Sequence, residues 1–331
     1  MVKANKMTAV VINQYGDEDQ LSKQEMPIPT IAEDELLVKV ESIAVNPIDW
    51  KTRQGLRQER YPFEFPIILG QEMAGTVVKV GAKVTEFNVD DEVIGYGTPS
   101  NRGTYAQYFK IKADQVAKKP SAISFEEAAG LGLAGTTAWE ALFDAGKLKA
   151  GQTVLILAGS GGVGMMAVQL AKNAGAHVIS TTSTANVDFV KDLGADEVID
   201  YKKTAFSSEV KNVDLVLDTL GGDNQRAAFQ VVKPGGRVIS IVETTAQAAQ
   251  LSDKFNVTFD KINAHPDQKI IRELAAMFGA GKLTVWVTAT LPFTVDNVKK
   301  LHRQSAAGHV VGKLVLNVNY LKNFMKTKRA N

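Results

Sequence analysis

The chain has 331 residues, more than one ordinary domain needs and enough for two. Hydrophobic residues make up 45% and charged residues 22%, which is the balance of a globular protein and excludes a disordered or fibrous chain. Lys and Arg (38) nearly balance Asp and Glu (36), so the net charge of +2 gives no basic field that could hold nucleic acid. We therefore expect no nucleic-acid partner, and the basic residues near the C-terminus are interpreted as a solvated tail: Lys322, Lys326, Lys328 and Arg329.

The sequence contains no cysteine. This excludes disulfides, thiolate nucleophiles, iron–sulfur clusters and every zinc site built on cysteine. The four histidines are scattered without the spacing of metal ligands, so no metal site is expected. No signal-peptide pattern is present, and no apolar run approaches the roughly 20 residues that span a bilayer. The sequence thus predicts a cytoplasmic protein without a transmembrane segment.

Short β-forming runs fill the first third of the chain. β-Branched and aromatic residues gather in five runs separated by Gly, Pro and Asp-Asp, at residues 8–12, 36–45, 74–80, 92–97 and 104–111. This texture is typical of a compact antiparallel domain.

The pattern changes near residue 124. Ser124 and Glu127 form a capping box that predicts a helix start, and a second helix is expected over residues 136–145. Strands and helices then alternate, with apolar strands expected at 153–157, 177–181, 197–200, 213–218 and 237–242 and helices at 163–173, 187–193 and 223–231. Apolar strands separated by helices indicate a parallel sheet buried on both faces, and hence a doubly wound α/β domain.

The end of the chain is less regular. Helices are expected at residues 267–279 and 295–306, and strands at 285–290 and 313–318. Because the first domain is small for its number of strands, we expect the final segment to return and complete it. The predicted limits are therefore 1–123, 124–290 and 291–331.

A glycine-rich loop follows the predicted strand at 153–157. Gly159, Gly161 and Gly164 fit G-x-G-x-x-G between a buried strand and a helix, which is the context that the dinucleotide-binding motif requires. The glycines permit a tight turn, a close approach of backbone to a pyrophosphate and close helix–strand packing. The helix N-terminus offers free N–H groups and a partial positive charge. A tight turn without a ligand is the alternative, and dinucleotide binding is favoured, with the whole loop in contact: Gly159, Ser160, Gly161, Gly162, Val163 and Gly164.

The end of the next predicted strand indicates which dinucleotide is bound. An acidic residue there would hold the ribose hydroxyls of NAD and repel the 2′-phosphate of NADP. Residues 181–186 contain no acid, while hydroxyls and an amide such as Ser183 and Asn186 can donate hydrogen bonds to a phosphate. The sequence therefore favours NADPH over NADH, although no arginine is present and these residues could also form an ordinary polar loop.

Several segments together resemble one known family. They are Val45-Asn46-Pro47-Ile48-Asp49, Gly70-Gln71-Glu72-Met73-Ala74-Gly75, Ala134-Gly135-Thr136-Thr137-Ala138-Trp139, the loop Gly159–Gly164, Leu193-Gly194-Ala195-Asp196 to Asp200-Tyr201, and Gly308 to Gly312-Lys313. In this order they resemble the medium-chain dehydrogenase/reductase superfamily, and within it the zinc-free, zeta-crystallin-like quinone oxidoreductase branch.

The resemblance implies a GroES-like catalytic domain, an inserted Rossmann domain, and a C-terminal segment that rejoins the first domain. It also implies homodimers formed largely through the Rossmann domains. Zinc-dependent relatives place a catalytic Cys at Asn46 and a His at Gln71, and they carry a four-Cys lobe that this chain lacks. Alcohol oxidation through a zinc alkoxide, which needs a Lewis acid, is therefore not expected.

Without a metal, the resemblance implies hydride transfer from NADPH to a quinone or another α,β-unsaturated carbonyl. A carbonyl oxygen that gains negative charge needs hydrogen-bond donors nearby. We expect Asn46 to orient the acceptor, and Lys51 or solvent to supply a proton, although Asn46 could only set a turn and Lys51 could be a surface lysine. The resemblance adds three cofactor contacts, Thr137, Tyr201 and Lys313.

Two rival functions remain open. Enoyl-thioester reductases of the same superfamily use a tyrosine as proton donor at the position where Arg57 stands here, although Tyr61 is close. The second rival is a non-catalytic NADPH-binding protein, because this branch includes lens crystallins. The identity of the acceptor is not determined by the sequence.

Overall fold

The computed structural model describes residues 6–318, and the predicted basic tail lies outside this range. Contacts divide the chain into two compact units. Unit 1 contains the described residues up to Leu133, together with Pro266–Gly279 and the described residues from Val285 on. Unit 2 contains Ala134–His265 and Ala280–Thr284. The domain limits predicted at residues 123 and 290 remain a prediction, and the contacts group residues 124–133 and the helix at 268–279 with unit 1.

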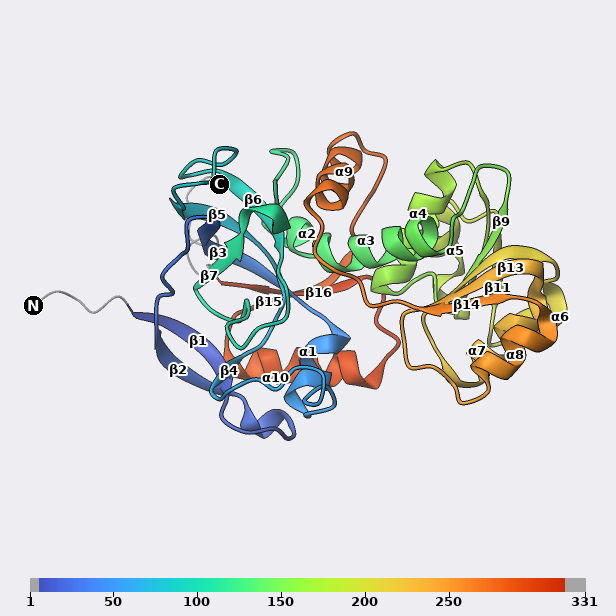
Figure 1. Cartoon of the computed structure of the whole chain (residues 1–331), viewed down its shortest axis with the longest axis horizontal. Helices are drawn as coiled ribbons and strands as arrows, with labels where there is room; N and C mark the ends of the chain where they lie inside the picture. The colour runs from blue at the N-terminus through green and yellow to red at the C-terminus, as the bar shows by residue number, and fades with distance from the viewer. Residues whose placement is uncertain (1–5, 319–331) are drawn as a thin grey trace, which may run out of the picture. The chain divides into compact units, whose positions relative to one another are not determined.

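Unit 1 is built mainly of antiparallel strands, as the alternation in the first third of the sequence predicts (Figure 1). A sheet of order β2-β1-β4 lies beside a seven-stranded sheet of order β15-β16-β3-β5-β6-β8, in which β7 also pairs with β3. The strands are β1 Lys6–Ile12, β2 Ser22–Pro27, β3 Glu35–Val45, β4 Ile67–Ile68, β5 Glu72–Val80, β6 Glu92–Tyr96, β7 Tyr108–Lys112, β8 Val116–Lys118, β15 Val287–Pro292 and β16 Lys313–Asn317.

The C-terminal segment returns to unit 1, as expected from the small size of the first domain. Strand β16 pairs antiparallel with β3, with Leu314 opposite Val45 and Asn317 opposite Ser42. The helices of this unit are α1 Pro47–Arg53, α2 Phe125–Ala129, α9 Gln268–Gly279 and α10 Val295–Ala307, and α3 Gly132–Trp139 begins in it. The register of β16 on β3 brings the start of β16 to the end of β3, where the functional residues gather.

Unit 2 is the predicted doubly wound α/β domain. Its sheet is parallel throughout and has the order β11-β10-β9-β12-β13-β14, the arrangement of a dinucleotide-binding Rossmann fold. The strands are β9 Thr153–Ile156, β10 His177–Thr182, β11 Glu197–Asp200, β12 Val213–Asp218, β13 Val232–Ser240 and β14 Thr258–Lys261. The helices are α4 Gly162–Asn173, α5 Val187–Asp192, α6 Phe206–Glu209, α7 Gly222–Val231 and α8 Ala248–Phe255.

Two of the predicted elements differ from the structure, and the sequence analysis did not predict several others, among them β2, β14, α1, α6 and α8. The helix expected over 136–145 is helix α3 followed by a π-helical turn over Glu140–Ala145. The strand expected from residue 104 begins only at Tyr108, because the Tyr105 N–H donates to Leu69 O and the chain turns there. The capping box at Ser124 is confirmed, with the Glu127 N–H donating to Ser124 Oγ at 3.2 Å.

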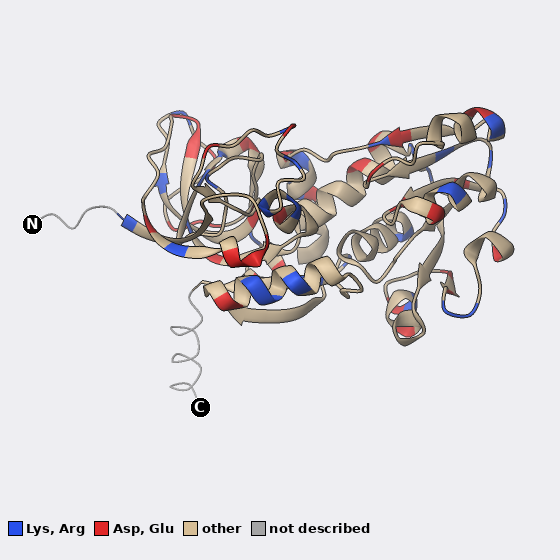
Figure 2. Ribbon diagram, turned by 90° about the horizontal axis from the view of Figure 1, so that it is seen from below, with Lys and Arg blue, Asp and Glu red and all other residues tan. Residues whose placement is uncertain are grey.

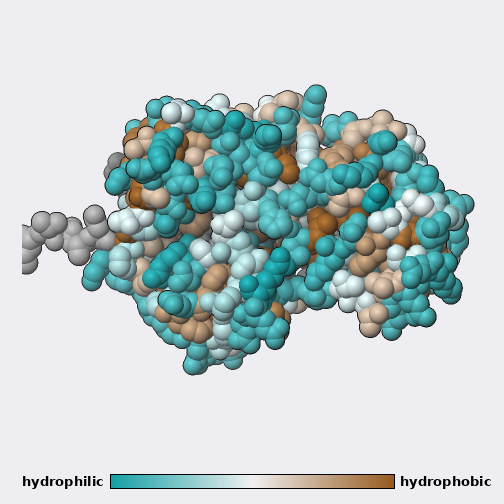
Figure 3. Space-filling model, viewed as in Figure 1, coloured by the Kyte–Doolittle hydropathy of each residue, from teal (hydrophilic) through white to brown (hydrophobic). Residues whose placement is uncertain are grey.

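Charged and hydrophobic residues are distributed over the parts of the molecule that Figures 2 and 3 show. Lys and Arg are interspersed with Asp and Glu along the ribbon in Figure 2, in keeping with the small net charge. The face shown in Figure 3 is mostly hydrophilic, with separate hydrophobic patches. Among residues 6–318, no helix is both long and apolar enough to cross a membrane.

Candidate active site

Three polar side chains form a buried cluster in unit 1. Lys313 Nζ donates to Asn46 Oδ1 at 2.6 Å and to Glu72 Oε1 at 2.7 Å. Asn46 Nδ2 donates to the same Glu72 oxygen at 2.8 Å and, at 3.4 Å, approaches Ala44 O. The Leu133 N–H donates to the other Glu72 oxygen at 2.6 Å. An ammonium, an amide and a carboxylate are thus joined in one closed set of hydrogen bonds.

The sheet of unit 1 explains why these residues meet. Asn46 directly follows the end of β3 and is the N-cap of α1, Glu72 begins β5, and Lys313 begins β16. Both β5 and β16 pair antiparallel with β3, so their first residues lie beside its last ones. Strand register therefore builds the cluster from three distant segments.

Burial makes this cluster strongly electrostatic. Asn46, Glu72 and Lys313 are 4%, 0% and 3% exposed, so water screens the pair of charges weakly. A lysine ammonium carries three N–H donors, and the hydrogen bonds described above use two of them. Within the described residues, the third N–H of Lys313 has no partner, which leaves one charged donor available to a ligand.

A second hydrogen-bonded group lies behind Asn46. The Asn46 N–H donates to Asp49 Oδ2 at 2.8 Å, and the same oxygen lies 3.1 Å from the Tyr105 hydroxyl. The hydroxyl lies 3.0 Å from His302 Nε2, and Arg53 Nε donates to His302 Nδ1 at 3.3 Å. Burial raises the pKa of Asp49 to about 7 and lowers the pKa of His302 to about 3. Burial also keeps the pKa of Tyr105 well above its ordinary value.

The segment before Glu72 is shaped by close packing. Gly70 has φ +91°, and a Cβ there would lie 2.2 Å from Thr104 Oγ1 and 2.6 Å from the ring of Tyr105. A glycine is needed because both the backbone conformation and the space exclude a side chain. The next residue, Gln71, is 8% exposed, and its Oε1 has no hydrogen-bond partner within the described residues.

The structure brings some predicted residues together and leaves others apart. Asn46 lies in the cluster, and Lys313, predicted as a cofactor contact, lies directly against it. Lys51 lies on α1 with its Nζ 5.5 Å from the centre of the Trp50 ring, and no hydrogen bond joins it to Asn46. Thr137 is buried on α3 in unit 2. The roles of these residues stay predictions.

In unit 2 the glycine loop has the predicted form. Gly161 is the N-cap of α4, and Gly162, Val163 and Gly164 form its first turn. Gly159 N donates to Thr181 O at 2.9 Å, and Thr182 Oγ1 donates to Ser160 Oγ at 3.0 Å, so the loop is tied to the end of β10. The helix N-terminus therefore presents its free N–H groups next to the end of the second strand.

The ends of β10 and β11 lie side by side. The Tyr201 N–H donates to Thr182 O at 3.0 Å, and Asn186 Nδ2 donates to Ser183 Oγ at 3.1 Å. Tyr201 is 43% exposed, and the Nζ of Lys202 lies 5.3 Å from the centre of its ring. Lys203 pairs with Asp200 at 3.4 Å.

The sequence prediction did not assign Lys202, Lys203 or Asp200 to the cofactor site. The carboxylate of Asp200 accepts a hydrogen bond from Thr184 Oγ1 at 2.7 Å, so this acid is already engaged within unit 2. Lys202 and Lys203 directly follow a strand of the sheet. Their positive charge at this place is the signal in the sequence that could have identified them as candidate cofactor contacts.

Three participants in unit 1 were also missed. The sequence analysis assigned no catalytic or binding role to Glu72, Tyr105 or His302. Tyr105 and His302 are fully buried polar residues, but nothing in the sequence states that residues 197 positions apart meet. Glu72 had a better signal, since a glutamate inside an apolar strand needs a cationic partner when it is buried.

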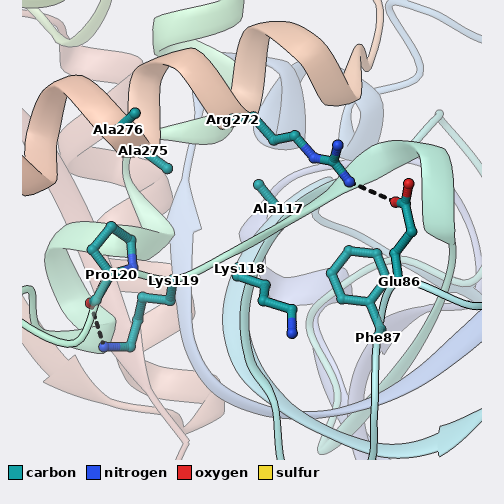
Figure 4. A pocket seen from close by; sticks show the side chains of 9 residues that line it. All are labelled: Glu86, Phe87, Ala117, Lys118, Lys119, Pro120, Arg272, Ala275 and Ala276. Carbon is teal, nitrogen blue, oxygen red and sulfur yellow. Dashed lines mark hydrogen bonds and ion pairs between the residues drawn. The ribbon is translucent and has the colours of Figure 1, made fainter.

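A cavity lies elsewhere in unit 1. Figure 4 shows helix α9 above it, with the Arg272 side chain directed toward Glu86. The Arg272–Glu86 ion pair is 2.5 Å long. The cavity has a volume of about 380 Å³, and its lining residues are Glu86, Phe87, Ala117, Lys118, Lys119, Pro120, Arg272, Ala275 and Ala276. The cations at its rim are already paired, since Lys119 and Lys118 lie 2.9 Å from Glu92 and Asp91. We assign no function to this cavity. Over residues 6–318, no group of three or more acidic or histidine side chains could hold a metal ion.

Comparison with known proteins agrees with both units. Residues 32–121 match the alcohol dehydrogenase GroES-like domain family, and residues 193–316 match the zinc-binding dehydrogenase family. The 2-methylene-furan-3-one reductase of Solanum lycopersicum is 34% identical over 321 residues, 94% of this chain and 79% of that protein. The chloroplastic NADPH-dependent alkenal/one oxidoreductase of Arabidopsis thaliana is 33% identical with the same two coverages.

A solved structure extends the likeness to the whole fold. The quinone oxidoreductase from Coxiella burnetii superposes with a TM-score of 0.86 at 30% identity, covering 95% of this chain and 99% of that one. The likeness in sequence and in fold thus extends over nearly the full chain. The chain belongs to the medium-chain dehydrogenase/reductase superfamily, in its quinone oxidoreductase branch.

Proposed function

We propose that this protein is an NADPH-dependent reductase that transfers hydride to a quinone or another α,β-unsaturated carbonyl without a metal ion. The observation that carries the proposal is the buried Lys313–Asn46–Glu72 cluster, which leaves one charged N–H donor free in unit 1. The relatives named as alkenal/one and quinone oxidoreductases support the same class of acceptor. Reduction of such an acceptor adds one hydride and one proton.

The residues of unit 2 fit a dinucleotide. A Cβ on Gly161 would have only Ala158 O nearby, at 3.4 Å, so the space above this residue is open for a ligand. The N-terminus of the 12-residue helix α4 presents its free N–H groups there. Bound NADPH supplies the hydride. Ser183, Asn186 and Lys202 would hold its 2′-phosphate, and Tyr201 would lie against the adenosine end.

The residues of unit 1 do not fit a zinc ion, although one matching family is named for zinc binding. The sequence has Asn46 and Gln71 where zinc-dependent relatives place Cys and His. Glu72 supplies the negative charge of this cluster. The Lys313 ammonium lies 2.7 Å from the Glu72 carboxylate and already neutralises that charge. A divalent cation at this carboxylate would lie against a positive charge, so the donor set supports a metal-free reaction.

In this proposal Lys313, rather than Asn46 or Lys51, contacts the carbonyl oxygen of the acceptor. Both polar atoms of the Asn46 amide are engaged within the cluster, so Asn46 holds Lys313 rather than donating freely. The free N–H of Lys313 would donate to the carbonyl oxygen of the acceptor as negative charge develops there. A fixed cation in a buried site stabilises such a charge far better than water does.

The enoyl-thioester alternative has less support from the structure. Arg57 occupies the position of the tyrosine donor, and its guanidinium carbon lies 4.5 Å from the centre of the Tyr61 ring. The phenol closest in sequence is thus covered by a cation. The other alternative, a non-catalytic NADPH-binding protein, predicts a different experimental result, because such a protein would bind NADPH without oxidising it.

Two further expectations accompany the proposal. We propose a homodimer, which light scattering on the purified protein would test, a monomeric mass contradicting it. The sequence predicts a cytoplasmic location, while a relative is named chloroplastic, and cell fractionation would decide between such compartments.

The experiment follows oxidation of NADPH and NADH with a 1,4-quinone and with a simple enone. We expect turnover with both acceptors and a kcat/KM at least about tenfold higher for NADPH, because a charge-assisted hydrogen bond to the 2′-phosphate contributes roughly 1.5–3 kcal/mol. Lys202→Ala should remove most of that preference by raising the KM for NADPH alone. Lys233→Ala, at the amino end of β13 in the same unit, is the matched control. Binding of NADPH without turnover on either acceptor would contradict the proposal.

A further inference from the structure

The hydrogen bonds behind Asn46 form one continuous buried chain. It runs from Arg53 to His302, from His302 to Tyr105, from Tyr105 to Asp49, and from Asp49 to the backbone of Asn46. All five residues are 4% exposed or less. The reductase reaction proposed above requires none of the four side chains to touch the acceptor or the cofactor.

The hydrogen bonds of this buried chain can run in only one donor-to-acceptor direction. An arginine guanidinium is a donor only, so Arg53 Nε–H fixes His302 Nδ1 as an acceptor. Neutral histidine then carries its proton on Nε2, which donates to the Tyr105 oxygen at 3.0 Å. The Tyr105 O–H is left to donate to Asp49 Oδ2 at 3.1 Å. His302 and Tyr105 thus each accept a hydrogen bond on one side and donate one on the other, while Arg53 only donates and the Asp49 carboxylate only accepts.

The charges around the chain agree with this direction. Burial and the nearby Arg53 charge lower the pKa of His302 to about 3, so the ring is neutral across the physiological range. Asp49 is faced by Tyr105, by Glu72 on β5, which raises its pKa, and by Lys313 on β16, which lowers it. With burial the largest effect, the pKa of Asp49 is about 7. Asp49 is therefore the member of the chain whose charge changes near neutral pH.

The hydrogen-bond chain also holds helix α1 at two points. Asp49 and Arg53 are one helical turn apart on α1, and Tyr105 and His302 bridge them from outside the helix. Figure 1 shows α10, which carries His302, running alongside α1. Arg53 Nη1 additionally donates to Gly16 O at 2.8 Å. The position of Asn46, the N-cap of α1, thus depends on residues from the loop before β7 and from α10.

We propose that Asp49, Tyr105 and His302 are positioning residues. A hydrogen-bond chain directed from Arg53 to the Asp49 carboxylate, which also accepts from the Asn46 N–H, holds Asn46 and Lys313 for reaction while Asp49 is ionised. The inference rests on the proposed function, because it assigns the chain to the same cluster. Protonation of Asp49 removes the charge that strengthens both hydrogen bonds to its Oδ2 and so loosens Asn46. Turnover then rises with pH as Asp49 ionises.

The first test is the tautomer of His302 in the wild-type protein. Nitrogen-15 NMR of histidine-labelled protein, with the signal assigned by the variant His302→Gln, distinguishes Nε2–H from Nδ1–H and from the cation. We expect a neutral Nε2–H ring whose shifts stay constant between about pH 5 and 9, because the pKa of His302 is about 3. An Nδ1–H tautomer or a charged ring would overturn the assigned direction.

The second test is the variant Tyr105→Phe, which removes one hydroxyl and keeps the ring. We expect kcat at neutral pH to fall by about tenfold, through misplacement of Asn46, while the KM for NADPH is unchanged. The Tyr105 hydrogen bond lowers the pKa of Asp49, so its loss should move the acidic limb of the kcat profile, near pH 7 in the wild type, upward by about one pH unit. Asp49→Asn should abolish the limb.

The control is Tyr108→Phe, since the Tyr108 hydroxyl has no hydrogen-bond partner between residues 6 and 318, and its profile should match the wild type. A Tyr105→Phe enzyme that folds and retains both the wild-type kcat and the wild-type limb would overturn the positioning role. If wild-type protein oxidises no NADPH with any acceptor, the proposed function fails, whereas the tautomer experiment still decides the direction of the chain.

Discussion

Replacing Lys313 by Met lowers kcat with a quinone by about 100- to 1,000-fold, the range observed when one donor to a developing oxyanion is removed. The same change leaves the Glu72 carboxylate, which is 0% exposed, without its cation. An uncompensated buried charge costs about 3–5 kcal/mol, so the free energy of unfolding should fall by this amount. Steady-state kinetics and urea unfolding measure the two effects on the same preparation.

A second variant separates catalysis from stability. Combining Lys313→Met with Glu72→Gln removes both charges of the buried pair while keeping the shape of residue 72. We expect most of the lost stability to return, because no buried charge is left unpaired. The turnover number should stay low, because the charged donor is still missing. Recovery of turnover together with stability would assign Lys313 a structural role alone.

The second large effect concerns the glycine loop. Gly161→Ala should weaken NADPH binding by about 10- to 100-fold, because a methyl group would hold the pyrophosphate away from the N–H donors of α4. The fold should tolerate this change, since the backbone of Gly161 has φ −76° and a Cβ would meet only Ala158 O at 3.4 Å. Fluorescence titration with NADPH gives the affinity, and thermal unfolding without cofactor gives the stability.

Gly164→Ala is the matched comparison in the same loop. A Cβ on Gly164 would lie 2.1 Å from Ala158 O and 2.9 Å from the backbone of Gly159, so the helix must move off the strand. We expect the free energy of unfolding without cofactor to fall by about 1–3 kcal/mol. Equal loss of stability in both variants would contradict the assignment of the space at Gly161 to a ligand.

Local patterns were sufficient to predict most elements. The capping box at Ser124 and the apolar strands of unit 2 depend on neighbours within a few residues, and the structure has them at nearly the predicted positions. The prediction that a strand starts at residue 104 was wrong because contacts with residues distant in the sequence determine the backbone there. Thr104 and Tyr105 have β-forming character, but their N–H groups donate to Gly70 O and Leu69 O, and the segment forms only an isolated bridge with β1, between Ala106 and Ala9.

The active site was harder to predict from the sequence because the residues that contact one another in it are far apart in the chain. Lys51 was chosen as the lysine nearest to Asn46 in the chain, whereas the lysine that binds Asn46 is 267 residues away. The register of β16 on β3 makes that contact, and register depends on the whole sheet rather than on local sequence. The glycine loop could be identified because its chemistry depends on the backbone of one short segment.

The most direct test of a metal-free NADPH reductase follows the hydride itself. Protein treated with a strong chelator is given a simple enone and NADPH that carries deuterium at the transferable position of the nicotinamide. We expect the ketone product to carry that deuterium on its β-carbon, at a rate that the chelator does not change. Product without deuterium, or a rate that is lost with the chelator and restored by zinc, would contradict the proposed reaction.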